Sequence, residues 1–181
     1  SGSYCTGNII ESNHVYENCQ QQDDAFGIDL YSVGNNNRVL RNTVHDQYNT
    51  LLDPDNHNVP VPEGAISMCG TGGIRFDGNN TGMSLNVTGN QAYNNLVYNE
   101  LQAFQIIHIN NTQIFNNTIL YTKTDAPTDT FLRVGVFIAT NPYVATNTDN
   151  TSFINNIVSS KGFLVWKTSG STNCHINYNV Y

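Results

Sequence analysis

The sequence predicts an all-β domain in which short strands stack as the coils of a parallel β-solenoid. Three observations predict it: a short motif recurs six times, a second motif led by glycine falls between the copies, and asparagine supplies 29 of the 181 residues. Charged residues make up only 12% of the chain, about half the ~25% that is usual for soluble domains. This composition favours stacked side-chain amides over a densely charged surface.

The first motif predicts one short strand and its turn in each coil. It begins with Asn or Thr, continues with two or three residues of which one is apolar, and ends with Asn and an apolar pair. Its copies are residues 8–15, 37–44, 91–97, 112–119, 151–158 and 173–180. Repetition of a unit too small to form its own core is typical of solenoids, in which neighbouring units share one continuous core.

The second motif predicts the second strand of each coil, so that each unit reads strand, turn, strand, turn. A glycine precedes apolar residues two apart in residues 27–30, 73–76, 135–138 and 162–165, and residues 103–106 take the same place without the glycine. Units of 20 to 30 residues without a helix cannot form βαβ crossovers. We therefore expect about five to six coils in one domain spanning 1–181, with a long loop insertion at about 48–72.

Stacking explains the abundance of asparagine. Equivalent residues of successive coils lie about 4.8 Å apart, so amides at one turn position can hydrogen-bond along the stack, whereas carboxylates there would repel. We expect Asn116 to belong to such a ladder. An antiparallel sandwich is the structural alternative, but it gives no reason for Asn to recur at one phase of the repeat.

The segments NNRVLRNTV, NTQIFNNTIL, NTSFINNIV and NCHINYNVY, together with GIDL and GGIRF, carry a resemblance to a known superfamily. They resemble the right-handed parallel β-helix of the pectin-lyase-like proteins, in particular the polysaccharide lyases, epimerases and glycoside hydrolases. The resemblance implies a right-handed solenoid and a polysaccharide partner. Because the chain starts and stops within a repeat, we expect part of a longer solenoid whose ends are covered by further chain or by a partner.

Charge and hydropathy narrow the classes of partner. The net charge is −7 and the seven basic residues form no run, which disfavours a nucleic-acid partner. No apolar stretch approaches the ~18 residues of a membrane span. We expect a secreted or cell-surface protein. The four cysteines are compatible with that compartment: pairing of Cys19 with Cys5 or with Cys69 is feasible, and free thiols are equally compatible.

Strand alternation selects the candidate site. If the apolar residues of the glycine-led strands point inward, then Asp29, Tyr31, Arg75 and Asp77 point outward. Asp29 and Arg75 would stack on adjacent coils, and the same column would continue through Gln105, Phe137, Leu164 and Trp166. Sugars need polar partners for their hydroxyls and aromatic partners for their C–H faces. The predicted substrate-binding residues are therefore Tyr31, Gln105 and Trp166.

Two kinds of carbohydrate chemistry fit these residues. For β-elimination or epimerisation of a uronate, Arg75 would neutralise the carboxylate, a histidine (His45, His57 or His108) would be the base, and Tyr31 or Tyr48 the acid. For glycoside hydrolysis, Asp29 and Asp77 would be the two carboxylates. The insertion at 48–72 should overhang Arg75 and carries His57. The candidate catalytic residues are Asp29, Arg75, Asp77 and His57.

Other readings of the same residues stay open. Asp29, Arg75 and Asp77 also fit a surface ion-pair ladder, and the protein would then be a non-catalytic structural or adhesive solenoid of a cell-surface or fibre protein. The Asp53 and Asp55 pair could ligate Ca²⁺, but it lacks the pattern of a dedicated calcium loop. No other metal site is predicted. His14 and His175 are expected at turns, without a catalytic role. The sequence leaves lyase, epimerase, hydrolase and binding protein open.

Overall fold

The computed structural model describes residues 5–17, 26–46, 72–78, 87–100, 102–122, 134–139, 148–159, 165–167 and 171–181. These residues form sixteen short strands. The described part of the chain contains no helix, and so none that is long and apolar enough to span a membrane. The predicted insertion at 48–72 lies outside the described residues except for its last residue, Gly72.

The strands assemble into three parallel sheets. Sheet 1 contains β1 (Ile9–Glu11), β4 (Arg38–Leu40), β7 (Asn90–Tyr93), β10 (Thr112–Phe115), β13 (Ser152–Ile154) and β16 (His175–Asn177). Sheet 2 contains β2 (His14–Tyr16), β5 (Thr43–His45), β8 (Leu96–Tyr98), β11 (Thr118–Leu120) and β14 (Ile157–Ser159). Sheet 3 contains β3 (Phe26–Tyr31), β6 (Gly72–Asp77), β9 (Gln102–Ile107), β12 (Val134–Ala139) and β15 (Val165–Lys167). All pairings between these strands are parallel, so the antiparallel sandwich is wrong.

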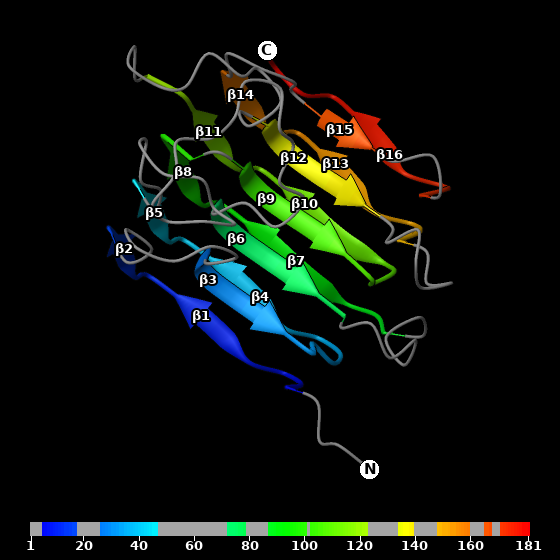
Figure 1. The fold of residues 1–181 in the computed structure, drawn as a ribbon. Helices are drawn as coiled ribbons and strands as arrows, with labels where there is room; N and C mark the ends of the chain where they lie inside the picture. Colours follow the sequence, from blue (N-terminus) through cyan, green and yellow to red (C-terminus); the bar gives the residue numbers. More distant parts are fainter. Residues whose placement is uncertain are drawn as a thin grey trace, which may run out of the picture.

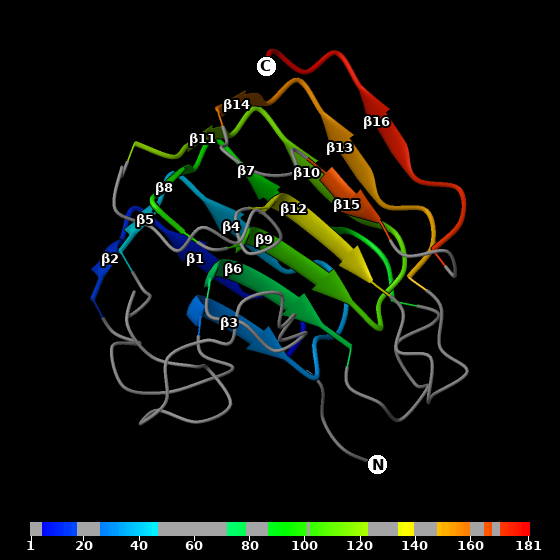
Figure 2. The ribbon, with the colours of Figure 1, turned by 45° about the horizontal axis from the view of Figure 1, so that its top comes forward.

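The chain visits the three sheets in rotation, so each coil has three strands rather than the predicted two, because each copy of the first motif forms a strand on both sides of a corner. β1, β2 and β3 form the first coil, and β16 begins a sixth. The coils lie one above another between the two ends of the chain (Figure 1). In the turned view, sheet 3 lies in front of sheet 1 and sheet 2 closes one side (Figure 2). The prediction of an all-β chain of five to six coils is confirmed, and the arrangement is consistent with a parallel β-solenoid.

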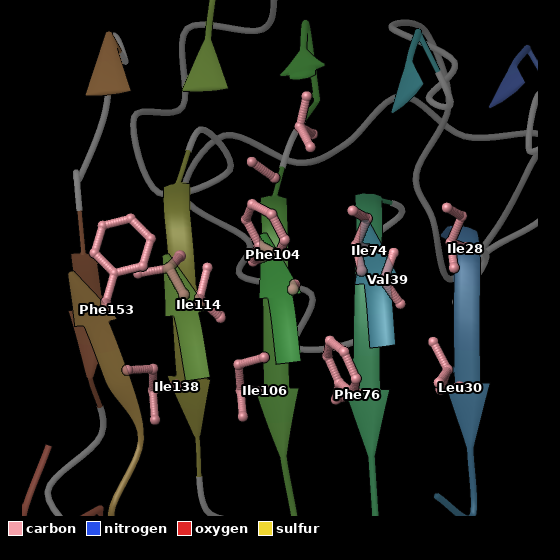
Figure 3. Packing of buried hydrophobic residues seen from close by; sticks show 14 of the residues in the cluster. Ile28, Leu30, Val39, Ile74, Phe76, Phe104, Ile106, Ile114, Ile138 and Phe153 are labelled. Atoms are coloured by element: carbon pink, nitrogen blue, oxygen red, sulfur yellow. The ribbon is translucent and has the colours of Figure 1, made fainter. Parts of the chain in front are cut away.

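Apolar residues at equivalent positions fill the space between the sheets. In sheet 3, Ile28, Ile74 and Phe104 share one register position and Leu30, Phe76, Ile106 and Ile138 share another (Figure 3). The short strands of sheets 1 and 2 each contribute one inward residue; the fully buried ones include Val39, Ile114, Phe153, Val44 and Val97. Each side chain therefore packs on its counterparts in the neighbouring coils, and stacking adds core continuously.

The corners between sheets are made by residues in the left-handed backbone region. Immediately before sheet 1 these residues have φ between 50° and 75°: Gly7, Asn36, Gly89, Asn111, Asn150 and Asn173. Between sheets 1 and 2 they have φ between 54° and 59°: Ser12, Arg41, Asn94, Asn116, Asn155 and Tyr178. Glycine and asparagine adopt this region with the least strain, which explains their frequency at these corners.

An unbroken asparagine ladder follows the corner between sheets 1 and 2. Its members, one from each coil, are Asn13, Asn42, Asn95, Asn117, Asn156 and Asn179. In every link the backbone N–H and the side-chain Nδ2 of one Asn donate to Oδ1 of the Asn in the next coil, at 2.9–3.1 Å. The predicted stacking of amides is confirmed, and it satisfies polar groups that the corner would otherwise bury without partners.

One detail of the predicted ladder is wrong by a single residue. Asn117, not Asn116, is the ladder member, and Asn116 is the exposed corner residue before it, with φ 56°. The pairs Asn94–Asn95 and Asn155–Asn156 have the same division of roles. Asparagine suits both positions, because it tolerates the left-handed region and also carries an amide.

A second ladder lies at the corner immediately before sheet 1. Its residue type changes along the stack from asparagine to threonine. Asn8 donates to Asn37 Oδ1 and Asn37 donates to Asn90 Oδ1, at 2.8–3.0 Å. In the next two coils this place is taken by Thr112 and Thr151, both fully buried. Within the described part of the chain, neither threonine hydroxyl has a hydrogen-bond partner. These two positions therefore carry the cost of an unsatisfied buried hydroxyl.

Replacing Thr112 by Val is expected to stabilise the fold by about 1 kcal/mol, because the variant keeps the shape and removes a buried, unpaired hydroxyl. Urea unfolding of both proteins measures the difference. Thr43→Val, at a partly exposed position at the start of β5, is the control and should change stability by less than about 0.5 kcal/mol. A loss of stability in Thr112→Val alone would mean that the hydroxyl is hydrogen-bonded.

Candidate functional site

The predicted column of residues on the outer face of sheet 3 is confirmed in register. Asp29 of β3 pairs with Arg75 of β6, and Arg75 pairs with Gln105 of β9. Gln105 is followed by Phe137 of β12 and by Trp166 of β15. These five residues form one row across five coils. Along the row the residue type changes from ionic to amide and then to aromatic. Leu164 lies outside the described residues.

Arg75 is held in place by Asp29. Its Nε donates to Asp29 Oδ1 at 3.0 Å and its Nη2 donates to Oδ2 at 2.6 Å, which is the bidentate geometry that suits a guanidinium and a carboxylate. The guanidinium also lies over the Phe26 ring, 4.7 Å from its centroid, and 6.0 Å from that of Tyr31. Arg75 is only 4% exposed. It is therefore an oriented, charge-compensated group rather than a free surface cation.

Asp77 pairs with a histidine from the next coil. His108 directly follows Ile107, the register partner of Asp77, so both side chains lie at the same end of sheet 3. His108 Nδ1 lies 3.1 Å from Asp77 Oδ1, and both residues are buried. An ionised carboxylate only accepts hydrogen bonds, so the proton of the neutral imidazole is assigned to Nδ1.

This pairing leaves the other ring nitrogen of His108 as the acceptor. His108 Nε2 is buried and, among the described residues, has no hydrogen-bond partner. A carboxylate that fixes the tautomer of an imidazole, with the second nitrogen open, is the arrangement of a general base. We name Asp29, Arg75, Asp77 and His108 the Arg75 cluster.

The predicted substrate-binding residues differ in their surroundings. Tyr31, the register partner of Asp77 on β3, is 54% exposed and can meet a ligand. Gln105 is 1% exposed, and its side-chain Nε2 donates to Gln102 Oε1 at 2.9 Å, so it is a buried residue of the sheet. For Trp166 the structure gives the strand position only.

The histidine candidates separate clearly. His57, with Tyr48, Asp53 and Asp55 of the predicted insertion, lies outside the described residues. His45 lies on β5 in sheet 2 and not on the sheet that carries Arg75. His108 is the described histidine that the fold brings to Asp77. The sequence feature that could have identified this pair is the alignment of Asp77 with Ile107, because His108 is the residue directly after Ile107.

Two smaller expectations are also resolved. His14 and His175 do not lie at turns, since each is the first residue of a strand, β2 and β16 respectively. Cys5 and Cys174 are free cysteines, and Cys19 and Cys69 lie outside the described residues. Burial raises the pKa of the Cys174 thiol, so this cysteine stays protonated at neutral pH and is a poor nucleophile.

The Arg75 cluster can therefore orient a base, hold a positive charge beside it and present an exposed phenol nearby. These are the components of a proton-transfer site, and they come from strands separated by up to 79 residues in the sequence, since Asp29 and His108 belong to it. No protein family, curated protein or solved structure was found to match the chain.

Proposed function

We propose that the chain is a right-handed parallel β-helix of the pectin-lyase-like kind, and that it binds and chemically modifies a polysaccharide along the outer face of sheet 3. Rotation through three parallel sheets and the asparagine ladders support the fold assignment. The register row from Asp29 and Arg75 to Phe137 and Trp166 supports the substrate class, because sugars combine hydroxyl groups with apolar ring faces. A polymeric glycan would be met at the cell surface or after secretion.

The pairing of Asp77 with His108 carries the proposed reaction type. In this proposal His108 Nε2 removes the proton next to the carboxylate of a uronate, and Asp77 holds the imidazole in the required tautomer. Arg75, positioned by Asp29, stabilises the negative charge that develops on the substrate. Tyr31 supplies the returning proton: in a lyase to the glycosidic oxygen that leaves C4 as the C4–C5 double bond forms, and in an epimerase to C5 from the opposite face. Because His108 Nε2 is buried, residues that cover it must move aside when the polymer binds.

Hydrolysis is the less favoured of the two chemistries. A glycosidase needs one protonated and one free carboxyl group on either side of the glycosidic bond. Here Asp29 is engaged by Arg75 and Asp77 by His108. Both carboxylates are thus committed to orienting other groups, which favours a lyase or an epimerase acting on an acidic polysaccharide.

His108→Asn tests this proposal. The Asn side chain can still donate to Asp77 and tolerates the left-handed backbone of this position (φ 54°), but it lacks the basic nitrogen. Turnover of a uronan, followed by the ultraviolet absorbance of unsaturated products and by NMR of the sugar epimers, is expected to fall by about 10²-fold or more. His175→Asn, at an exposed strand position, should keep full activity. Full turnover by His108→Asn would show that His108 is not the catalytic base.

A second function is favoured by one specific observation. Arg75, Asp77 and His108 are 4%, 5% and 7% exposed and are paired with one another or with Asp29, as in an ion-pair network that specifies a fold. The protein would then be a non-catalytic structural or adhesive solenoid. Absence of turnover by the native chain on a panel of uronans and neutral glycans, together with a lowered melting temperature of Asp77→Asn, would support this function.

A further inference from the structure

The outer face of sheet 2 carries a stack of rings in its first three coils. Tyr16 of β2, His45 of β5 and Tyr98 of β8 share one register position. The His45 ring lies parallel to both phenol rings, with centroid distances of 5.4 Å to Tyr16 and 4.3 Å to Tyr98. The plane of the His45 imidazole is thereby fixed.

The nitrogens of His45 have defined partners. Nδ1 lies 2.7 Å from Asp46 Oδ2, so the proton of the neutral ring is assigned to Nδ1, which donates to the carboxylate. Nε2 then presents its lone pair to His14, whose own Nε2 lies 2.7 Å away. Two imidazole nitrogens facing each other at this distance share a single proton between them.

A carboxylate bound to one nitrogen of a histidine, with the other nitrogen facing a second histidine, is a surrounding that suits a metal ligand. The carboxylate fixes the tautomer, keeps the ring oriented and raises the basicity of the ligating nitrogen. Imidazole ligands suit zinc and copper, whereas calcium and magnesium prefer oxygen ligands. Burial, and secondarily the Asp46 carboxylate, raise the pKa of Tyr98, so the ring stacked on His45 stays an uncharged phenol.

We propose that His14 and His45 form a binding site for a divalent transition-metal ion, Zn²⁺ or Cu²⁺, through their two Nε2 atoms. At zinc–nitrogen distances of about 2.0–2.1 Å in tetrahedral geometry, the two nitrogens would lie roughly 3.3 Å apart. The pair must therefore open by a few tenths of an ångström from 2.7 Å and release the shared proton. His14 is exposed and belongs to the first coil, so it can make this adjustment while His45 stays clamped.

Space and ligand number define the kind of site. A hollow of about 430 Å³ lined by His14, Val15, Tyr16 and Glu17 adjoins the pair and leaves room for water ligands. Within the described residues, no group of three or more His, Cys, Asp or Glu side chains could hold a metal ion. The described part of the chain therefore supplies two protein ligands, with water in the remaining positions, and we expect weaker binding than at a structural site with four protein ligands.

Isothermal titration of the untagged 181-residue chain with ZnCl₂ and with CuCl₂ tests the proposal. We expect one saturable site, which His14→Gln and His45→Gln each remove. Asp46→Asn should weaken binding by about 10- to 100-fold, because it changes only the group behind the ligand. His175→Gln, which alters an exposed histidine on the last described strand, should bind as the native chain does.

A spectroscopic readout keeps the test independent of folding defects. The electron paramagnetic resonance spectrum of the Cu²⁺ complex should show coupling to two imidazole nitrogens in the native chain and to one in His14→Gln, whose exposed position makes misfolding an inadequate explanation. Absence of saturable binding by the native chain, or unchanged binding in both His14→Gln and His45→Gln, would overturn the site.

Discussion

Replacement of Asn117 by Ala is expected to destabilise the protein by about 4 kcal/mol. Asn117 is 1% exposed, and its Oδ1 accepts hydrogen bonds from the backbone N–H and from Nδ2 of Asn95 at 3.0 and 2.9 Å. Its own Nδ2 donates to Ala92 O, Phe115 O and Asn156 Oδ1. Alanine leaves the backbone N–H of Asn95 and one hydrogen of its Nδ2 without an acceptor, each costing roughly 1–3 kcal/mol, while Nδ2 still donates to Val39 O. It also interrupts the ladder at its centre.

Chemical denaturation with a common linear extrapolation measures this change. Asn116→Gly is the matched control, because it alters the same residue type one position earlier at an exposed corner where φ is 56°. Glycine accepts this backbone conformation, so the control should shift stability by less than about 1 kcal/mol. Equal losses in the two variants would show that the ladder contributes nothing beyond corner geometry.

Replacement of Phe104 by Ala is expected to cost roughly 3–5 kcal/mol. Phe104 is fully buried at the middle of its column, next to Ile74 of β6 (Figure 3). Its register partner on the other side is Val136 of β12. Because equivalent residues lie directly above and below it, the neighbouring coils cannot close the cavity without losing their own register. The variant thus loses both the transfer free energy of the ring and the contacts of the cavity lining.

Phe115→Ala provides the comparison for Phe104→Ala. Phe115 is partly exposed on sheet 1 and stacks on Tyr93 with ring centroids 4.9 Å apart. Its removal should cost about 1–1.5 kcal/mol, since the contact lies at the surface. Thermal or urea unfolding of both variants distinguishes the two sites. A cost for Phe104→Ala no larger than that for Phe115→Ala would contradict a rigidly stacked core.

Much of the fold follows from periodicity in the sequence. The six copies of the first motif correspond to the two short strands of each coil, and the glycine-led motif corresponds to sheet 3. Alternation along the glycine-led strands also predicts that Asp29, Arg75 and Gln105 share one register position, which is confirmed. These features are predictable because register in a solenoid is set by equivalent residues, which the sequence displays directly.

The errors have a physical origin in residues that suit two positions. In the Asn116–Asn117 pair, one residue takes the left-handed corner and the other joins the ladder, and the side-chain chemistry of asparagine permits either order. His14 directly follows the ladder residue Asn13 and begins β2, and His175 begins β16.

The contents of the site were harder to predict than its position. Strand alternation predicts that Arg75 and Asp77 point to the outer face of the sheet. It does not predict that they are buried, because alternation does not show what packs against that face. The pairing of Asp77 with His108 depends on the corner after β9, where φ of His108 is 54° and simple alternation ends. His57 and the insertion at 48–72 lie outside the described residues, and their proposed role stays a prediction.

The unbroken ladder has a direction. Each of its five links runs from the N–H groups of one coil to the oxygen of the next, so the amide dipoles of six asparagines point the same way along the axis. Their alignment polarises successive hydrogen bonds and strengthens the column cooperatively. At the Asn13 end the row presents an oxygen to which no described residue donates, whereas Asn179 at the opposite end receives hydrogen bonds. The two faces of the stack are thus electrically unlike, and a strand added to the first coil would have to donate where one added to the last would have to accept.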